Sequence, residues 1–233
     1  MRLLAASIAA LCLCAATSMT VLAAEPKTEE EKALYALGVA LSQSITTFSL
    51  TDQELEWVKS GVTDGAKGKT KDFDPQPYFA KLSEMQKTRA TAAGKAVLDK
   101  AAAEKGAKRL PSGLVIATIK EGTGPSPKAT DTVKVHYHGT LADGRVFDSS
   151  RKRGEPATFP LNGVIKCWTE GVQLMKVGGN SKLTCPADLA YADRPPPGSA
   201  IPPGATLIFE VELLGIENPA APPAKAPAPE KKN

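Results

Sequence analysis

A single predicted hairpin, V-K-V-H-Y-H-G-T-L-A-D-G-R-V-F-D-S-S over residues 133–150, constrains the fold of this chain more than any other segment. Its first strand alternates, so that two valines and Tyr137 share one face while a lysine and two histidines share the other. Asp143-Gly144 supplies the turn. The returning strand places Phe147 beside Asp148, and a buried acid needs a partner such as a phenol hydroxyl. We therefore expect a concave apolar site that contains a phenol and a carboxylate.

Residues 1–24 have the pattern of a signal peptide. One basic residue precedes an apolar run that ends in small residues, which predicts cleavage after Ala23 or Ala24 and export to the periplasm. A retained membrane helix is the alternative, but polar residues interrupt the run, so no membrane span is expected after cleavage. Cys12 and Cys14 each follow a leucine, which argues against a lipid anchor.

Removal of this segment leaves Cys167 and Cys185 as the two cysteines of the mature chain. Because an oxidising compartment permits disulfides, we predict a bond between them. The alternative is a pair of small, buried, apolar thiols.

Three helices are predicted before residue 109. Two begin at capping boxes, Thr28-x-x-Glu31 and Thr51-x-x-Glu54, each followed by apolar residues at helical spacing. The third begins at Asp74-Pro75 and meets no breaker other than Gly94 before residue 106. Its second half is mostly alanine, lysine, glutamate and threonine, which predicts a spacer helix that stands in solvent.

The helical part is too small to bury its apolar faces alone. We assign residues 25–73 to a dimerisation domain and residues 74–108 to a long connecting helix, and we expect a symmetric homodimer. The alternative is a monomeric three-helix cap that folds onto the downstream domain.

Residues 109–217 form a second predicted domain of period-two strands and turns, with one short helix near residues 168–175. Its last strand points four apolar residues inward, from Leu207 to Leu213, and places residues 206, 208, 210 and 212 outward. The fold class is α+β, with an antiparallel sheet wrapped around one helix. Residues 218–233 are rich in proline, alanine and lysine, which is typical of a disordered tail.

Several functions are disfavoured by composition. The net charge of +4 is distributed along the chain without a basic stripe, so nucleic acid is not an expected partner. His136 and His138 are the only histidines and lack a third ligand, so no metal or other cofactor is expected. The Gly-x-Ser-x-Gly pattern of a serine nucleophile is also absent.

Aromatic residues gather in the second domain, where they are expected to face inward or to cap a cavity. Core packing alone would explain any one of them. A carboxylate, Asp148, and two phenols are expected beside these rings, and this combination favours a binding site over simple core packing. The aromatic residues are Tyr137, Phe147, Phe159, Trp168, Tyr191 and Phe209.

Residues 134–216 resemble the FKBP-type peptidyl-prolyl cis-trans isomerases. The shared motifs are the V-H-Y-x-G-T-L-x-D-G-x-V-F-D-S-S hairpin, the run F-P-L-x-x-V-I-x-x-W-x-E-G-V-Q-L-M-x-V-G, the tetrapeptide D-L-A-Y and the segment I-P-P-x-A-T-L-I-F-E-V-E-L-L. The helical first domain is similar to that of the periplasmic dimeric branch, which includes the macrophage-infectivity-potentiator proteins.

The resemblance implies a proline pocket with catalytic and substrate-binding residues. Trp168 would form its floor, and Tyr191 would donate a hydrogen bond to a substrate carbonyl, while Arg153 would support Asp148. Ile201 would border the pocket. The remaining walls would come from Tyr137, Phe147, Val164, Ile165 and Phe209.

Three departures from the family pattern stand out. Ala157 replaces an aromatic wall residue found in many members, which predicts a more open pocket. Cys167 replaces the usual glycine before the tryptophan, which supports the disulfide. The segment Ala192–Ala200 is richer in proline than the usual flap, so its ligand contacts are open.

We therefore expect an isomerase that accelerates X-Pro rotation in exported, proline-containing, unfolded or partly folded proteins, by binding the twisted amide in an aromatic pocket. The alternative is a dimeric periplasmic holdase chaperone with little or no isomerase activity. The resemblance also implies a macrolide of the FK506 type as a candidate ligand.

Overall fold

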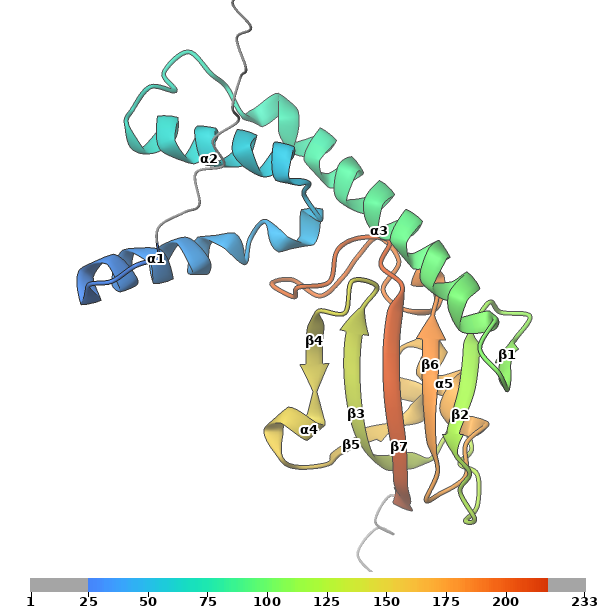
Figure 1. Cartoon of the computed structure of the whole chain (residues 1–233). Coiled ribbons are helices and arrows are strands. Elements are labelled where there is room, and N and C mark those ends of the chain that lie inside the picture. The colour runs from blue at the N-terminus through green and yellow to red at the C-terminus, as the bar shows by residue number, and fades with distance from the viewer. Residues whose placement is uncertain (1–24, 218–233) are drawn as a thin grey trace, which may run out of the picture. The chain divides into compact units, whose positions relative to one another are not determined.

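The computed structural model describes residues 25–217. The expected signal peptide and the expected C-terminal tail lie outside this range. The chain divides after Ser42 into two compact units, which we describe separately. The first contains helix α1 (Glu29–Ser42), and the second contains all the other elements, as labelled in Figure 1.

Helices α1 and α2 (Asp52–Ala66) begin where the capping boxes predict. Thr28 Oγ1 accepts the N–H of Glu31 at 3.1 Å, and the Thr28 N–H donates to the Glu31 carboxylate at 2.9 Å. The same reciprocal pair joins Thr51 and Glu54. The apolar spacing of the first helix continues to Phe48, but α1 ends at Ser42 and is followed by a 3₁₀ turn, η1 (Thr46–Phe48). Neither α-helix contains a buried residue.

Helix α3 (Phe79–Ala102) follows a 3₁₀ turn, η2 (Gln76–Tyr78), and is shorter than the sequence predicts. The Asp74 side chain accepts the N–H of Gln76 at 3.0 Å, so the predicted cap begins the 3₁₀ turn and not the α-helix. Within residues 25–217, no helix combines the length and the apolar character that crossing a bilayer requires.

The second half of α3 was predicted to stand in solvent; most of its residues are exposed, but one face packs against the sheet, which the prediction missed. Gly94 is buried, and a Cβ atom there would lie 2.3 Å from Thr206 Oγ1 at the start of the last strand. Ala101 is buried as well, and in the first half of the helix Lys87 forms an ion pair with Asp193 at 2.6 Å. Small residues bring this helix close to the second domain, so its low content of large apolar residues reflects close packing.

Residues 107–217 contain an antiparallel sheet in the order β1-β2-β6-β7-β3-β4, with β5 also paired to β3. All of its pairings are antiparallel. The strands are β1 (Ala107–Arg109), β2 (Val115–Lys120), β3 (Thr132–Leu141), β4 (Val146–Ser149), β5 (Ala157–Pro160), β6 (Asn180–Cys185) and β7 (Leu207–Glu217).

The predicted hairpin is confirmed as β3 and β4, with Gly139 paired to Asp148 and Gly144 in the turn at φ 85°. Alternate residues of β3, from Val133 to Leu141, are buried as expected. In β7 the four inward residues are also buried. Thr206, which was expected to face outward, is buried under α3.

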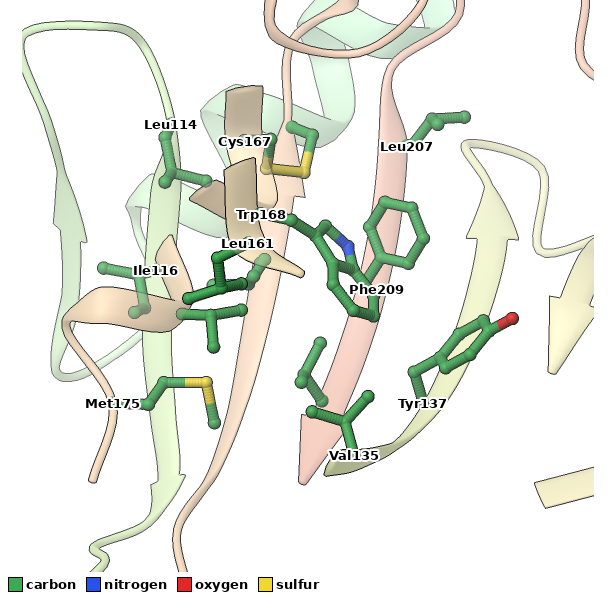
Figure 2. Packing of buried hydrophobic residues seen from close by; sticks show 14 of the residues in the cluster. Leu114, Ile116, Val135, Tyr137, Leu161, Cys167, Trp168, Met175, Leu207 and Phe209 are labelled. Atoms are coloured by element: carbon green, nitrogen blue, oxygen red, sulfur yellow. A yellow bond between two sulfur atoms is a disulfide. The ribbon is translucent and has the colours of Figure 1, made fainter. Parts of the chain in front are cut away.

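One face of the sheet packs against helix α5 (Lys166–Gln173), which lies behind the strands in Figure 1. Gly171 permits this approach, since a Cβ there would lie 2.9 Å from a methyl group of Leu183. The core between helix and sheet includes Trp168, Val172 and Leu183, and Figure 2 shows part of it. Shorter elements are α4 (Ser150–Arg153), η3 (Leu161–Gly163) and η4 (Ala187–Leu189).

Candidate active site

An apolar pocket of about 500 Å³ lies between α5 and the edge of the sheet. This volume is in the range of small-molecule binding sites. Eight of the residues predicted for the site line it, together with Phe159 and Gly163. The lining consists of Tyr137, Phe147, Asp148, Phe159, Gly163, Val164, Ile165, Trp168, Tyr191 and Phe209.

Trp168 forms the floor of this pocket. Its side chain is only 4% exposed and meets three aromatic rings edge to face, with interplanar angles of 83° to 88°. The rings of Tyr137, Phe159 and Phe209 lie 5.4, 5.6 and 5.3 Å away, respectively. Trp168 Nε1 has no hydrogen-bond acceptor among the described residues, and in Figure 2 its nitrogen lies beside the Phe209 ring. The floor is therefore a closely packed aromatic surface.

Phe147 forms one wall because β3 leaves room for its ring. It packs at 90° against Phe209, with centroids 5.5 Å apart. A Cβ atom on Gly139 would lie 2.7 Å from Phe147 Cζ, so the ring occupies the space of a missing side chain. No role was predicted for Gly139. The available signal was a glycine at a buried position in an otherwise regular strand.

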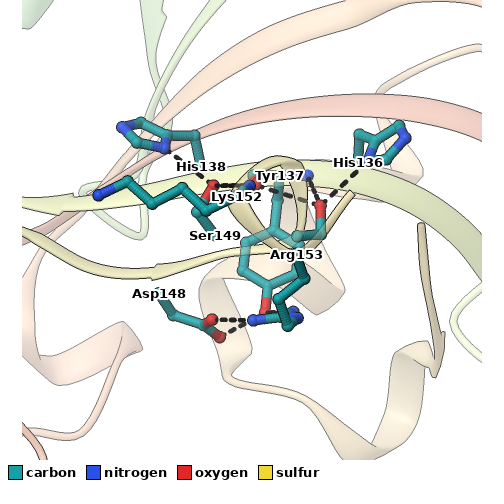
Figure 3. Close-up of polar contacts among 8 residues, drawn as sticks. His136, Tyr137, His138, Asp148, Ser149, Lys152 and Arg153 are labelled. Carbon is teal, nitrogen blue, oxygen red and sulfur yellow. Dashed lines mark hydrogen bonds and ion pairs between the residues drawn. The ribbon is translucent and has the colours of Figure 1, made fainter. Parts of the chain in front are cut away.

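Tyr137, Asp148 and Arg153 form a polar triad at the side of the pocket (Figure 3). The Tyr137 hydroxyl donates to Asp148 Oδ2, and Arg153 donates both to Asp148 Oδ1 and, at 2.9 Å, to the Tyr137 oxygen. The Arg153 guanidinium carbon also lies 5.6 Å from the centre of the Tyr137 ring. Arg153 itself is not part of the pocket lining, so it acts on the site through these two partners.

The triad holds its members in definite protonation states. Burial raises the pKa of the Tyr137 phenol, and the hydrogen bond to Asp148 raises it further. Burial alone would raise the pKa of Asp148, but hydrogen bonds from Tyr137 and Arg153 outweigh it and leave the pKa below its ordinary value. The pKa of Arg153 is raised by its bonds to Tyr137 and Asp148. At neutral pH the phenol is therefore a donor and the carboxylate is ionised.

The last two residues of the hairpin segment, Ser149 and Ser150, stabilise the short helix α4 that carries Arg153. Ser149 caps α4 by accepting the N–H of Lys152, and Ser150 Oγ accepts the N–H of Tyr137 at 2.8 Å. The histidines contact the same two serines, with His136 Nδ1 3.2 Å from Ser150 Oγ and His138 Nδ1 3.0 Å from Ser149 Oγ. Both histidines thus have a structural role, and the two serines are functional supports that sequence analysis missed.

The remaining predicted site residues lie at two depths. Val164, Ile165 and Tyr191 are half-buried at the rim of the pocket, and Ile165 is the residue that precedes the first turn of α5. Ile201 is 7% exposed and belongs to the hydrophobic core, outside the pocket lining. Ala157 also lies outside the lining and pairs with Val135 in the sheet.

A disulfide joins Cys167 of α5 to Cys185 at the end of β6, with the Cα atoms 5.7 Å apart. Both side chains are fully buried. The bond lies behind the floor of the pocket and connects the helix to the sheet (Figure 2).

Comparisons with known proteins agree on one family. Residues 124–214 match the family model of the FKBP-type peptidyl-prolyl cis-trans isomerases, and residues 30–115 match that of the domain amino-terminal to this isomerase. The chain is 45% identical to the FKBP-type isomerase FkpA of Aeromonas hydrophila, covering 85% of this chain and 80% of that protein. It is 35% identical to the outer membrane protein MIP of Legionella longbeachae, covering 94% and 99%.

A solved structure has the same architecture. The crystal structure of FkpA from Escherichia coli covers 82% of this chain and 98% of its own, with a TM-score of 0.56 and 39% sequence identity. The predicted family and fold class are therefore confirmed.

Proposed function

Since the chain belongs to the FKBP-type peptidyl-prolyl cis-trans isomerase family, we propose that the pocket around Trp168 is the site at which it accelerates rotation about X-Pro bonds. The observation that carries this assignment is the pocket itself, which is lined mainly by aromatic rings and has a single polar side. A proline ring fits such a surface, and neither a nucleophile nor a metal is required for a rotation.

The barrier to this rotation is electronic. Resonance gives the amide C–N bond partial double-bond character, which costs about 18 to 20 kcal/mol to overcome. The twisted amide is less polar than the planar one, so an apolar aromatic floor favours the transition state over the ground state. Each 1.36 kcal/mol of such preference is worth about tenfold in rate.

Two donors at the rim would hold the substrate. The N–H of Ile165 and the hydroxyl of Tyr191 both lie at the pocket, and neither makes a hydrogen bond within residues 25–217. They are suited to bind the carbonyls that flank the proline, so that the bound peptide is held while the amide rotates.

The triad would supply the polar side of the site. Asp148 and Arg153 orient the phenol of Tyr137, and the ionised carboxylate presents its field to the rotating carbonyl. No proton transfer is assigned to Asp148, because its lowered pKa leaves it ionised at neutral pH. The same aromatic pocket is the proposed site for a macrolide of the FK506 type.

The proposed clients are exported proteins with unfolded, proline-containing segments. This proposal depends on the signal peptide pattern of residues 1–24 and on a periplasmic location. The proposed assembly is a homodimer formed by residues 25–73, with residues 74–108 as the connection to the isomerase domain. Its support is the exposure of large apolar side chains, for example Leu34 at 64% and Trp57 at 72%.

Asp148→Ala tests the site directly. We expect kcat/KM for an X-Pro tetrapeptide to fall about 10- to 100-fold, since charge-assisted hydrogen bonds and the orientation of the phenol are lost. Glu121→Ala is the matched control, because Glu121 is an exposed carboxylate outside the pocket. Equal activities of the two variants, both folded by circular dichroism, would place the site elsewhere. A wild-type protein that suppresses client aggregation without isomerase activity would favour the holdase alternative.

A further inference from the structure

The disulfide between Cys167 and Cys185 lies outside the pocket lining, yet it joins the two segments that carry the rim donors. Cys167 is the second residue of α5, and Cys185 is the last residue of β6. Their Cα separation of 5.7 Å is typical of disulfides in natural proteins. Because both side chains are fully buried, neither has access to substrate.

On the helix side, the path from the disulfide to the first donor is short and rigid. Ile165 lies two residues before Cys167, and its carbonyl accepts the N–H groups of Trp168 at 2.9 Å and Thr169 at 3.1 Å. Thr169 Oγ1 also donates to the carbonyl of Leu161 at 2.6 Å, which ties α5 to the segment before it. A displacement of Cys167 would therefore carry the Ile165 N–H with it.

On the sheet side, a compact turn connects Cys185 to the second donor. The N–H of Leu189 donates to the carbonyl of Pro186 at 3.0 Å, and the N–H of Ala190 donates to that of Ala187 at 2.9 Å. Tyr191 follows directly. Cys185 is itself held at the end of β6 by its pairing with Leu207, the first residue of β7. The hydrogen-bonded turn therefore fixes the position of Tyr191 relative to the end of β6.

We propose that the Cys167–Cys185 disulfide is a positioning device that sets the separation between the Ile165 N–H and the Tyr191 hydroxyl. The inference rests on the proposed function, in which these two donors hold the carbonyls on either side of the proline. Without the bond, α5 would be held on the sheet by noncovalent packing alone, and the helix could shift relative to β6. A shift of about 1 Å in a bound geometry can cost up to about a hundredfold in rate.

Two cysteine-free variants test this role, Cys167→Ala with Cys185→Ala, and Cys167→Gly with Cys185→Val. The second pair restores apolar volume at position 185 in case the first does not fold. Thermal unfolding sets a temperature at which all the proteins are fully folded, and tetrapeptide isomerisation is measured there. We expect kcat to fall about three- to tenfold with KM changed less than about twofold, because loosened donors lose selectivity for the twisted amide.

Leu213→Ala separates positioning from stability. Leu213 is fully buried in β7 and lies outside the pocket lining, so its truncation lowers stability without changing the rim. Its kcat should equal that of the wild type at the chosen temperature. If the cysteine-free proteins also keep the wild-type kcat, the disulfide only stabilises the fold and the inference is overturned.

A double-mutant cycle with Tyr191→Phe locates the effect. If the disulfide acts by placing Tyr191, the loss caused by Tyr191→Phe should be at least about twofold smaller in a cysteine-free background than in the wild type. Additive losses would contradict the inference. A wild-type protein without isomerase activity would instead refute the proposed function, and the inference with it, and this outcome is recognised before any variant is compared.

Discussion

Large apolar side chains are mostly buried in residues 109–217, whereas those of helices α1 and α2 are mostly exposed. Residues 109–217 bury most of their large apolar side chains around Trp168 and leave an aromatic pocket open. In α1 the apolar residues Leu34, Leu37 and Leu41 are 64, 58 and 56% exposed, and α2 likewise contains no buried residue. The first region has a complete hydrophobic core, whereas each of these helices requires another apolar surface to cover it.

The difference separates two roles. A pocket that performs a rotation needs rigid walls, which a close-packed core supplies. Exposed apolar stripes on amphipathic helices instead favour association. Changes in the sheet domain should therefore affect catalysis, and changes in α1 or α2 should affect assembly.

Among substitutions outside the pocket lining, Gly139→Ala is expected to have the largest effect on catalysis. The added methyl group would lie 2.7 Å from the Phe147 ring and push it into the pocket. Because the displaced ring obstructs the pocket, we expect kcat/KM for a tetrapeptide to fall about tenfold or more, and overpacking of this kind also lowers stability by about 1–3 kcal/mol.

The matched control is Gly61→Ala in α2, where a Cβ atom would have no neighbour within 4 Å. Alanine is favoured over glycine in a helix by about 1 kcal/mol, so this variant should be slightly more stable and fully active. If Gly61→Ala lost activity as Gly139→Ala does, the proposed separation between a catalytic sheet and assembly helices would be contradicted.

Local signals predicted much of this fold. The capping boxes at Thr28 and Thr51 and the Asp143-Gly144 turn depend on neighbours a few residues away, and all three are confirmed. Contacts between segments that are distant in the sequence were harder to predict. The approach of Gly94 to Thr206 joins residues more than a hundred positions apart, and no local pattern specifies it.

The site shows the same division. Tyr137, Phe147 and Asp148 were predictable because one hairpin brings them together. The roles of Arg153 and Tyr191 entered through the family resemblance, since neither has a distinctive local pattern. Ile201 was expected to border the pocket; it is buried in the core and is not among the lining residues, because the course of the proline-rich segment before it cannot be derived from composition.

Leu37→Glu tests the other side of the comparison. If the apolar face of α1 is buried in a homodimer, a charge there should weaken dimerisation by about 100-fold or more, since each of the two protomers loses a buried leucine worth about 1.5–3 kcal/mol. Light scattering over a concentration series measures the shift, and tetrapeptide turnover should stay within about twofold of the wild type. Lys32→Glu, an exposed change on the same helix, should leave the dimer intact. A wild-type protein that is monomeric at micromolar concentration would refute the assembly proposal.

Tetrapeptide turnover should be nearly independent of pH between about 5 and 9, because no group of the triad titrates there. The pKa of Tyr137 lies above its ordinary value of 10.0, and that of Asp148 lies below its ordinary value of 3.8. The stabilisation that Asp148 provides is complete above the unfolded pKa and is lost as the pH falls through the folded pKa. A bell-shaped profile centred near neutrality would indicate general acid–base catalysis and contradict the proposed mechanism.

The smallest effect is expected from the link between α2 and α3. Hydrogen bonds from Arg89 and from the Thr51 backbone lower the pKa of Glu54 from 4.5 to about 2. Its contribution is therefore complete above pH 4.5 and is lost as the pH falls toward 2. Because the pair is only partly buried, Glu54→Gln should change the unfolding temperature only slightly at pH 7, and still less near pH 2. A large change at pH 7 would mean that this pair has a greater role.

The chain's two tryptophans allow the central claim to be tested in one measurement, because Trp168 lies on the pocket floor and Trp57 lies on α2. Titration with an X-Pro tetrapeptide can be followed by the two indole N–H resonances in a ¹H–¹⁵N spectrum, with Trp57→Phe used to assign them. We predict that the Trp168 resonance shifts in a saturable manner while the Trp57 resonance stays in place. A shift of Trp57 with an unmoved Trp168 resonance would show that peptide binds the helices and that the aromatic pocket is not the isomerase site.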